Sequence, residues 1–294
     1  MTRSFSLLTK TYRGDASLFG ELCESIDEHM PEIEHYVLVD GGDFPLFAEF
    51  SGDRRHIIDC SRELPRFKEL DVFGRRIWWR FPHRIVRGWI FQQIARLHFA
   101  SRLDCDAVVS VDSDAVFVRP IDPHQVFDGK RIRFFKVPDR PSGPAAESPK
   151  WHDAASDALG LPKVGYTGHD YITTTLVWSP AIVRDLLEHI SDLWNRPWHD
   201  VLIRPFRFSE CVLYGVYASF VAKDIEAHLS PTQQTMCHIS WGYDLELRAE
   251  RLRFARDIAD HQCAIVVQSN LGLDRSTRNE IIELVRDQVR AKAA

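Results

Sequence analysis

The stretch Val108–Pro120, VVSVDSDAVFVRP, decides the fold class. It places Asp112 and Asp114 on either side of one serine, directly after the apolar run AVVSV and before a second run, AVFV. The first run predicts a buried strand, and charge at the end of such a strand is costly unless it is paired or holds a metal. Because Mg²⁺ and Mn²⁺ prefer carboxylate and phosphate oxygens, the two carboxylates predict a nucleotide–metal site. On its spacing alone, D-x-D fits a surface turn between two strands equally well.

Segments on the N-terminal side of this stretch alternate between strand and helix patterns. Phe5–Thr9, His35–Val39 and Arg55–Asp59 are expected strands. The apolar spacing predicts a helix over about Ala16–Met30, with Asp15 as its cap. Such alternation predicts an α/β fold with a mixed, mainly parallel sheet flanked by helices.

Two further segments carry residue types that bind anions. Phe67–Arg84 is basic and aromatic without a clean period, and we expect a loop or short helix that brings Arg75 or Arg76 near a ligand. Arg87–Ala100 has helical spacing, and one of its stripes can present amides and a guanidinium to a phosphate or ribose. That stripe consists of Trp89, Gln92, Gln93 and Arg96. An ordinary solvated face is the alternative for both segments.

The C-terminal part of the chain supplies candidates for a second substrate. The Pro- and Ser-rich stretch Pro138–Pro149 is expected to be a mobile loop, either a lid or only a linker between the halves. The first half is residues 1–137 and the second half residues 138–294, within one continuous domain. In the second half, Gly168–Tyr171 (GHDY) suits hydroxyl groups and fits a plain turn equally well. Glu210 begins a predicted buried helix, where the helix dipole favours an anion whether or not that anion has a function.

Composition and charge disfavour several classes of function. The 294 residues carry a net charge of −5 with a pI of about 6.2. This charge provides no overall positive field to attract nucleic acid. No apolar run is long enough for a signal peptide or a membrane-spanning helix. The six cysteines are scattered without a C-x-x-C, a usage typical of reduced thiols in a cytoplasmic protein. Without a Walker A or G-x-G-x-x-G pattern, kinases and dinucleotide oxidoreductases are disfavoured too.

Three motifs in a fixed order carry a family resemblance. They are Gly88–Leu97 (GWIFQQIARL), the D-x-D with its following Val116–Pro120 (VFVRP), and Ser209–Gly215 (SECVLYG). Over residues 4–270 the chain resembles nucleotide-sugar glycosyltransferases of the GT-A type, and more closely a group of uncharacterised bacterial glycosyltransferase-like proteins. Arg96 departs from the lysine of that group's first motif, which keeps the charge but changes its geometry.

The resemblance implies a GT-A-like, Rossmann-like single domain with an acceptor-side elaboration. Residues 1–137 would bind the nucleotide sugar, and residues 138–294 would bind the acceptor and end in a C-terminal helix. The implied reaction moves a sugar from a nucleoside-diphosphate sugar to a hydroxyl acceptor, a glycan or glycolipid, with Mn²⁺ or Mg²⁺ as cofactor. The product would be a bacterial polysaccharide or glycoconjugate, and a lipid-linked acceptor would bring this cytoplasmic protein to the inner face of the membrane.

Carried onto this sequence, the GT-A pattern assigns the donor side. Asp114 is the implied metal ligand, and Asp112, next to Ser113, is the implied ribose contact or second metal contact. The ends of the first two strands hold the base in that family, which points here to Thr9, Tyr12, Asp15 and Asp40. A plain helix cap is the alternative for Asp15.

The same resemblance implies a carboxylate that deprotonates the acceptor hydroxyl. Glu210 is our choice for that base, and Asp170 competes with it. A base at Glu210 favours inversion, whereas a retaining transfer, which the sequence leaves open, would need no such base. Further expected acceptor contacts are His169, Tyr171 and Trp241. A third metal ligand in this family is often a histidine far along the chain, and among His228, His238 and His261 we expect His238.

Two other hypotheses fit parts of the sequence. Asp112–Val116 matches D-x-D-x-[TV], the nucleophile motif of haloacid-dehalogenase-like phosphatases, although those enzymes usually carry it on their first strand. A non-catalytic nucleotide- or glycan-binding protein on the same fold is the second alternative, because a fold does not fix a function. Metal-dependent donor binding and turnover separate these hypotheses.

Overall fold

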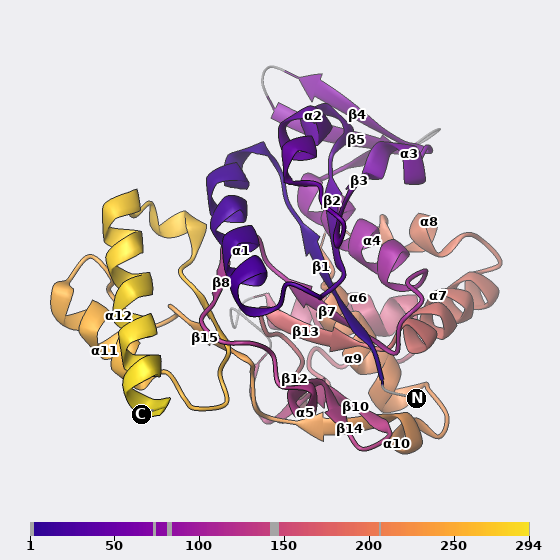
Figure 1. Ribbon diagram of the computed structural model, residues 1–294. Coiled ribbons are helices and arrows are strands. Elements are labelled where there is room, and N and C mark those ends of the chain that lie inside the picture. The colour runs from indigo at the N-terminus through magenta and orange to yellow at the C-terminus, as the bar shows by residue number, and fades with distance from the viewer. Residues whose placement is uncertain (1–2, 73–74, 81–83, 142–146, 206, 294) are drawn as a thin grey trace.

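The centre of the molecule is a five-stranded sheet in the order β13-β7-β1-β2-β3 (Figure 1). The structure, a computed structural model, describes residues 3–72, 75–80, 84–141, 147–205 and 207–293, without the side chains of residues 71, 72, 75 and 76. The parallel strands are β7 (Ala107–Val111), β1 (Phe5–Lys10), β2 (His35–Val39) and β3 (Arg55–Asp59). β13 (Thr175–Trp178) lies antiparallel beside β7. The predicted mixed, mainly parallel sheet is confirmed.

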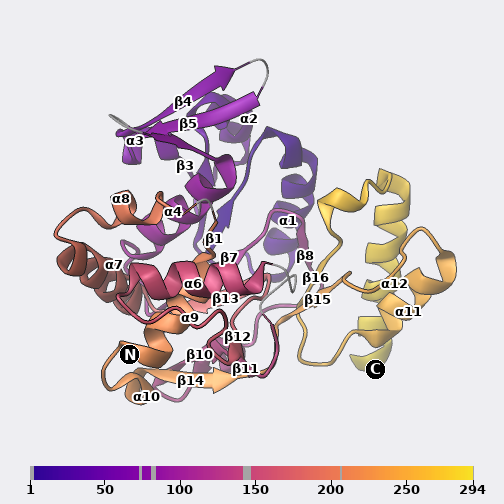
Figure 2. The ribbon, with the colours of Figure 1, turned by 180° about the vertical axis from the view of Figure 1, so that it is seen from behind.

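Helices cover both faces of this sheet (Figures 1 and 2). α1 (Ala16–His29) lies on one side and α4 (Gly88–Ala100) on the other, each with an apolar stripe turned inward. Between them, strand residues such as Leu7, Leu8 and Val37 are fully buried. Because β13 comes from the second half of the chain, one sheet and one core run through both halves of an α/β domain.

Three further helices pack on the α4 side of the sheet. They are α6 (Ser148–Ala158), α7 (Pro180–Trp194) and α9 (Glu210–Phe220). α9 is the buried helix predicted after Ser209, whose hydroxyl accepts a hydrogen bond from the Val212 N–H over 3.5 Å. Two small sheets lie beside these helices: β14 (Leu229–Thr232), β10 (Arg131–Phe135) and β9 (Phe127–Asp128) form one, and β11 (Val137–Pro138) and β12 (His169–Asp170) the other.

The strand that leaves the D-x-D is tied to the end of the chain. β8 (Ala115–Phe117) pairs with β16 (Ala264–Val266), which pairs with β15 (Cys237–Ile239). α11 (Arg248–Asp257) and α12 (Arg275–Ala293) pack against this sheet around a second apolar core, beyond α1 in Figures 1 and 2. The C-terminal helices therefore help to hold the strand that follows the D-x-D in place.

The segment Phe67–Arg84 is not the loop or short helix that its sequence predicts. It forms the antiparallel strands β4 (Phe67–Val72) and β5 (Arg75–Arg80), and β6 (Arg84–Val86) adds a third strand. Trp78 is buried and stacks on Phe91 of α4 with ring centroids 3.7 Å apart, whereas Trp79 is 44% exposed. Adjacent residues thus face opposite sides, a period of two that the many arginines obscure.

Shorter elements complete the chain between these units. They are η1 (Arg13–Asp15), η2 (Gly41–Asp43), α2 (Phe44–Phe47), η3 (Ala48–Phe50), α3 (Cys60–Glu63), α5 (Pro123–Val126), α8 (Trp198–Leu202), α10 (Ile225–His228) and η4 (Ser269–Leu271). Among the helices in the described ranges, none combines the length and the hydropathy that crossing a bilayer requires.

Candidate functional site

The carboxyl ends of β1, β2 and β7 meet at one edge of the central sheet, because the three strands are parallel. Lys10 ends β1, Asp40 follows β2, and Asp112 follows β7, whose five residues are all buried. In open α/β sheets this edge is where ligands bind. The structure thus brings the D-x-D to the usual ligand-binding edge.

Two adjoining cavities open at this edge. The small cavity, about 280 Å³, is lined by residues 112–114, by Gln93 and Arg96 of α4, and by Glu210 of α9. The large cavity, about 550 Å³, is lined by Tyr12, Asp40 and other residues of the strand ends. Both cavities share Lys10, Asp15, Trp89 and Gln92. Most of the predicted donor residues and the predicted base therefore share one continuous hollow.

Arg96 joins the D-x-D to Glu210. Its Nη2 lies 2.5 Å from Oδ1 of Asp112, and its Nη1 lies 3.1 Å from Oε1 of Glu210. Burial alone would lower the pKa of Arg96, but the two carboxylates raise it above its usual range. The guanidinium therefore stays charged, and its planar fork holds both acids at once, as a lysine ammonium would not.

Glu210 is held from two sides at the start of α9. Its backbone N–H donates to Oε1 of Gln93 over 2.8 Å, while its carboxylate accepts from Arg96. Burial raises the pKa of Glu210, and Arg96 opposes that rise. A carboxyl group with a raised pKa in a cavity wall has the properties of a general base. Gln93 also donates to the Trp89 carbonyl over 3.3 Å, so its amide supports Glu210 and α4 rather than reaching into the cavity.

Asp114 faces the small cavity from the turn after β7. Its Oδ2 accepts from the Ser269 N–H over 3.1 Å, and its backbone carbonyl accepts from Nη2 of Arg278 over 2.8 Å. Burial and the neighbouring Asp112 raise the pKa of Asp114 to about 6. Two crowded acids of this kind favour the approach of a divalent cation.

The two acids of the D-x-D suit Mg²⁺ or Mn²⁺ as part of a ligand set. Mg²⁺ usually binds one or two protein carboxylates and completes its shell with substrate phosphates and water. In the ranges that the structure describes, no group of three or more His, Cys, Asp or Glu side chains could hold a metal ion. A metal held by the D-x-D carboxylates would leave coordination positions for substrate phosphates or water.

Asp15 stands at the start of α1 without capping it. Its Oδ2 accepts a hydrogen bond from the Ser113 hydroxyl over 2.8 Å, and no side-chain bond caps the helix. Burial raises the pKa of Asp15, and the bond from Ser113 opposes that rise. Asp15 is therefore not the helix cap that the local sequence predicts. Its carboxylate instead connects the loop after β1 to Ser113 of the D-x-D by a hydrogen bond.

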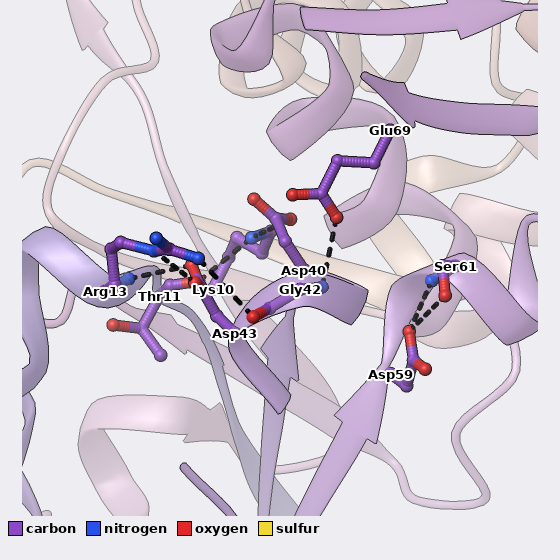
Figure 3. A network of polar contacts seen from close by, with 9 residues as sticks. All are labelled: Lys10, Thr11, Arg13, Asp40, Gly42, Asp43, Asp59, Ser61 and Glu69. Atoms are coloured by element: carbon purple, nitrogen blue, oxygen red, sulfur yellow. Dashed lines mark hydrogen bonds and ion pairs between the residues drawn. The ribbon is translucent and has the colours of Figure 1, made fainter. Parts of the chain in front are cut away.

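Lys10 and Asp40 form a buried ion pair at the wall of the large cavity, and Lys10 also lines the small one (Figure 3). Nζ of Lys10 lies 2.7 Å from Oδ1 of Asp40 and 2.9 Å from the Thr11 carbonyl oxygen. Beside them, Nε of Arg13 lies 2.6 Å from Oδ1 of Asp43. The sequence analysis predicts Asp40 as a site residue but misses Lys10. The available signal for Lys10 is its position as a charged residue at the end of the strand FSLLTK.

Two predicted residues have their polar groups engaged away from the cavities. Thr9 is fully buried, and its hydroxyl oxygen lies 2.9 Å from Nε2 of His35, so it does not line the base site expected from the sequence. His238 on β15 has its Nε2 2.9 Å from the Phe254 carbonyl oxygen and its ring stacked on Phe254. One of the two ring nitrogens of His238, the predicted third metal ligand, is thus engaged by the second core, and His238 lines neither cavity.

The GHDY segment is built into the fold at β12 and lines neither cavity. Asp170 is buried, and its Oδ2 accepts from Nε of Arg140 over 2.7 Å. Tyr171 is buried against Gly215 of α9, where a β-carbon would come within 2.2 Å of its ring. Tyr171 is therefore a core residue and not the accessible acceptor contact predicted, whereas its neighbour His169 is partly exposed. This packing also explains the glycine of the SECVLYG motif.

The remaining predicted residues are Trp241 and two arginines of β5. Trp241 follows β15, is 49% exposed and lines neither cavity. Arg75 and Arg76 belong to the backbone of β5, but their side chains lie outside the described part of the chain.

Arg278 of α12 is a site residue that the sequence pattern does not reveal. It is 4% exposed, and besides the Asp114 carbonyl it binds the Val267 carbonyl over 2.6 Å and Oε2 of Glu21 over 2.5 Å. The helix looks like a charged surface helix, and the only signal is the position of Arg278 on the same face as the buried Ile281 and Ile282.

Comparisons with known proteins give a family and a distant fold likeness. Residues 4–288 match the family of unknown function DUF6492, and the chain belongs to that family. Among solved structures, the galactosyltransferase LgtC in complex with donor and acceptor sugar analogs has a TM-score of 0.47 and 13% identity, with 96% of this chain and 95% of that chain covered. An active-site mutant of LgtC has a TM-score of 0.48 at the same identity and coverage. No curated protein matches the chain.

Proposed function

We propose that this chain is a GT-A-like, metal-dependent glycosyltransferase that moves a sugar from a nucleoside-diphosphate sugar to a hydroxyl acceptor. The observation that carries the proposal is the small cavity, which gathers Asp112, Asp114, Arg96 and Glu210 from three separate elements. A diphosphate leaving group needs positive charge beside it, and an acceptor hydroxyl needs a base. The small cavity supplies both requirements: Arg96 provides positive charge for the diphosphate, and Glu210 provides a base for the acceptor hydroxyl.

The large cavity suits the nucleoside end of the donor. Tyr12 and Trp89 are 50% and 43% exposed and offer ring faces there, and the Lys10–Asp40 pair offers both a hydrogen-bond donor and an acceptor. The diphosphate would then lie toward the small cavity, where Lys10 and Arg96 add positive charge.

Mg²⁺ or Mn²⁺ bound at the D-x-D would neutralise the diphosphate and so assist its departure. Because Arg96 already balances the charge of Asp112, Asp114 is the better candidate for direct ligation. Asp112 would then contact the ribose or a metal-bound water, as the resemblance implies. The bonds from Ser269 and Arg278 hold Asp114 for this role.

Glu210 would act as the base of an inverting transfer. The acceptor hydroxyl gives its proton to the Glu210 carboxylate as its oxygen bonds to the anomeric carbon of the sugar. The bond from that carbon to the diphosphate oxygen breaks, and the nucleoside diphosphate leaves with the electron pair. Arg96 stabilises the ionised form of Glu210, while burial raises the pKa of Glu210 and so increases its affinity for the proton.

We assign the nucleotide sugar to residues 1–137 and the acceptor to residues 138–294. The acceptor would be a glycan, a glycolipid or another hydroxyl compound, in bacterial polysaccharide or glycoconjugate synthesis in the cytoplasm. His169, Asp170 and Trp241 are proposed acceptor contacts outside the two cavities, and a large acceptor would be needed to reach them.

The phosphatase alternative is not favoured, because Asp112, which would attack phosphorus, is bound by the Arg96 guanidinium. The test is release of nucleoside diphosphate from a panel of nucleotide sugars with Mn²⁺, with water or added glycans as acceptor. We expect one donor class to be consumed by the wild type and not by Glu210→Gln. Release of inorganic phosphate from phosphomonoesters would support the phosphatase, and donor binding without turnover would support the binding protein.

A further inference from the structure

Lys68, Trp79 and Ile85 stand side by side on the outer face of the β4–β5–β6 sheet. The register pairs Trp79 with Lys68 across β4 and with Ile85 across β6, so their side chains share one face. Trp79 is 44% and Ile85 69% exposed, whereas Trp78 and Val86 on the inner face are buried. Packing of the inner face fixes the sheet, and the outer face holds two large apolar side chains in water.

The surroundings of this row are strongly basic in an acidic chain. Residues 66–87 contain seven Lys or Arg and two Asp or Glu, a net charge of +5, while the whole chain carries −5, so the rest carries −10. Among the described side chains of this segment, Arg66, Lys68, Arg84 and Arg87 are exposed. Lys68 stands in the row itself, whereas Arg84 pairs with the buried Arg80 and so belongs to the register of the inner face. A partner of this face must therefore accept apolar groups and carry negative charge.

We infer that the outer face of this sheet is a docking surface for a membrane rich in anionic lipids. Tryptophan and the stems of lysine and arginine favour the headgroup region, where ring and alkyl groups are buried while polar ends stay hydrated. Lys68 would bind a lipid phosphate, and the net positive charge of the segment would attract the anionic surface. A second copy of the chain is disfavoured as the occupant, because it would bring two segments of net charge +5 together.

The location of the sheet fits this use. In Figures 1 and 2, β4 and β5 lie at the periphery, well away from the C-terminal helices α11 and α12. Trp78, on the inner face of the same strand as Trp79, lines the large cavity. Docking through Trp79 would therefore place the cavity wall next to the bilayer, within reach of lipid-linked substrates. The inference stands apart from the proposed reaction, because membrane binding needs no turnover.

Cosedimentation with vesicles of phosphatidylcholine, with and without phosphatidylglycerol, tests this inference. We expect binding only to vesicles that contain phosphatidylglycerol, weakened by salt because the attraction is screened. Trp79→Ala/Ile85→Ala should weaken partitioning by about tenfold or more through lost apolar contact. Lys68→Gln should weaken it by about fivefold, the effect of one cation near an anionic surface.

The matched control is Trp241→Ala/Leu247→Ala, which removes an equally exposed aromatic–aliphatic pair, 49% and 55%, from another part of the surface. This variant should bind vesicles as the wild type does, and so should Asp114→Asn, which separates docking from donor binding. Failure of the wild type to bind anionic vesicles at low salt overturns the inference. So does wild-type binding by a Trp79→Ala/Ile85→Ala variant that circular dichroism shows to be folded, or self-association that this variant abolishes.

Discussion

Arg96 and Glu210 lie 114 positions apart in the sequence and meet in a buried ion pair, with Nη1 3.1 Å from Oε1. The same guanidinium binds Asp112, so one side chain of α4 joins the acid of the D-x-D to the acid proposed as base. The buried guanidinium of Arg96 therefore fixes the position of the proposed base relative to the proposed donor site. This arrangement makes Arg96 a positioning residue whose loss should disturb both acids together.

Removing Arg96 should destabilise the protein strongly. Arg96→Met leaves two carboxylates without their buried partner, which typically costs about 3–5 kcal/mol. Arg96→Lys should cost less, because the charge remains but cannot serve both acids at once. Urea unfolding measures each cost, and in a double-mutant cycle with Glu210→Gln we expect a coupling of about 0.5–3 kcal/mol. Simple additivity of the two substitutions would contradict the contact.

Glu210→Gln should separate binding from chemistry. Glutamine can still accept a hydrogen bond from Arg96 and keep its backbone bond to Gln93, but it cannot take the proton of an acceptor hydroxyl. We expect donor affinity close to that of the wild type, and a transfer rate lower by about 10²–10⁴-fold, the usual worth of a general base. If donor binding is lost while the melting temperature is kept, Glu210 belongs to the donor site instead.

Arg278 should matter far more than its place on a charged helix suggests. Arg278→Gln removes bonds to the carbonyls of Asp114 and Val267 and leaves Glu21 without its partner. We expect a loss of about 3 kcal/mol in unfolding free energy together with weaker donor binding. The control is Arg286→Gln on the same helix, whose exposed ion pairs should be worth less than about 1 kcal/mol. Equal effects of the two substitutions would rule out the special role of Arg278.

Acid should destabilise the fold through His35. Burial, with Arg55 and His56 adding to it, lowers the pKa of His35 to about 3 from its ordinary 6.5. The native state keeps His35 neutral while the unfolded chain takes up a proton, so stability falls as the pH drops below 6.5 toward 3. Between pH 6.5 and pH 5 the loss should be about 2 kcal/mol. His35→Gln, which cannot titrate, should lose that much less over the same interval in chemical unfolding, and identical losses would contradict the assignment.

Much of the fold was predictable because its signals are local. The strands β1, β2 and β7 are mostly apolar runs ended by a charge or a turn, and β3 is marked by Ile57 and Ile58 before Asp59. The helices α1 and α4 have clear helical spacing, and α9 is an apolar run long enough for a buried helix. The β4–β5–β6 sheet was not predicted, because it is defined by pairing between strands, such as that of Trp79 with Lys68 and Ile85. Its inner face is recognisable only once Trp78 is seen to stack on Phe91 of α4.

The residues of the candidate site likewise fall into those that local sequence patterns predict and those whose roles depend on the folded structure. Asp40, Asp112 and Asp114 follow the ends of parallel strands, which the sheet brings to one edge, and Glu210 follows from its motif. That α9 carries Glu210 to the same cavity as the D-x-D is a matter of tertiary packing. The roles of other residues depend on contacts over long separations that no local rule contains. Asp15 binds Ser113 in place of its own helix, and Tyr171 fills the space over a glycine of α9.

The central claim is tested most directly by titrating nucleoside diphosphates into the wild type and Asp114→Asn, with Mn²⁺ or with EDTA, by isothermal calorimetry. The account predicts that at least one nucleoside diphosphate binds the wild type with Mn²⁺, and that EDTA or the substitution weakens this binding by at least about tenfold. The substitution should not lower the melting temperature of the metal-free protein, because it removes a charge whose burial is unfavourable. An affinity that stays equal to that of the wild type with Mn²⁺, both in EDTA and in Asp114→Asn, would contradict the account.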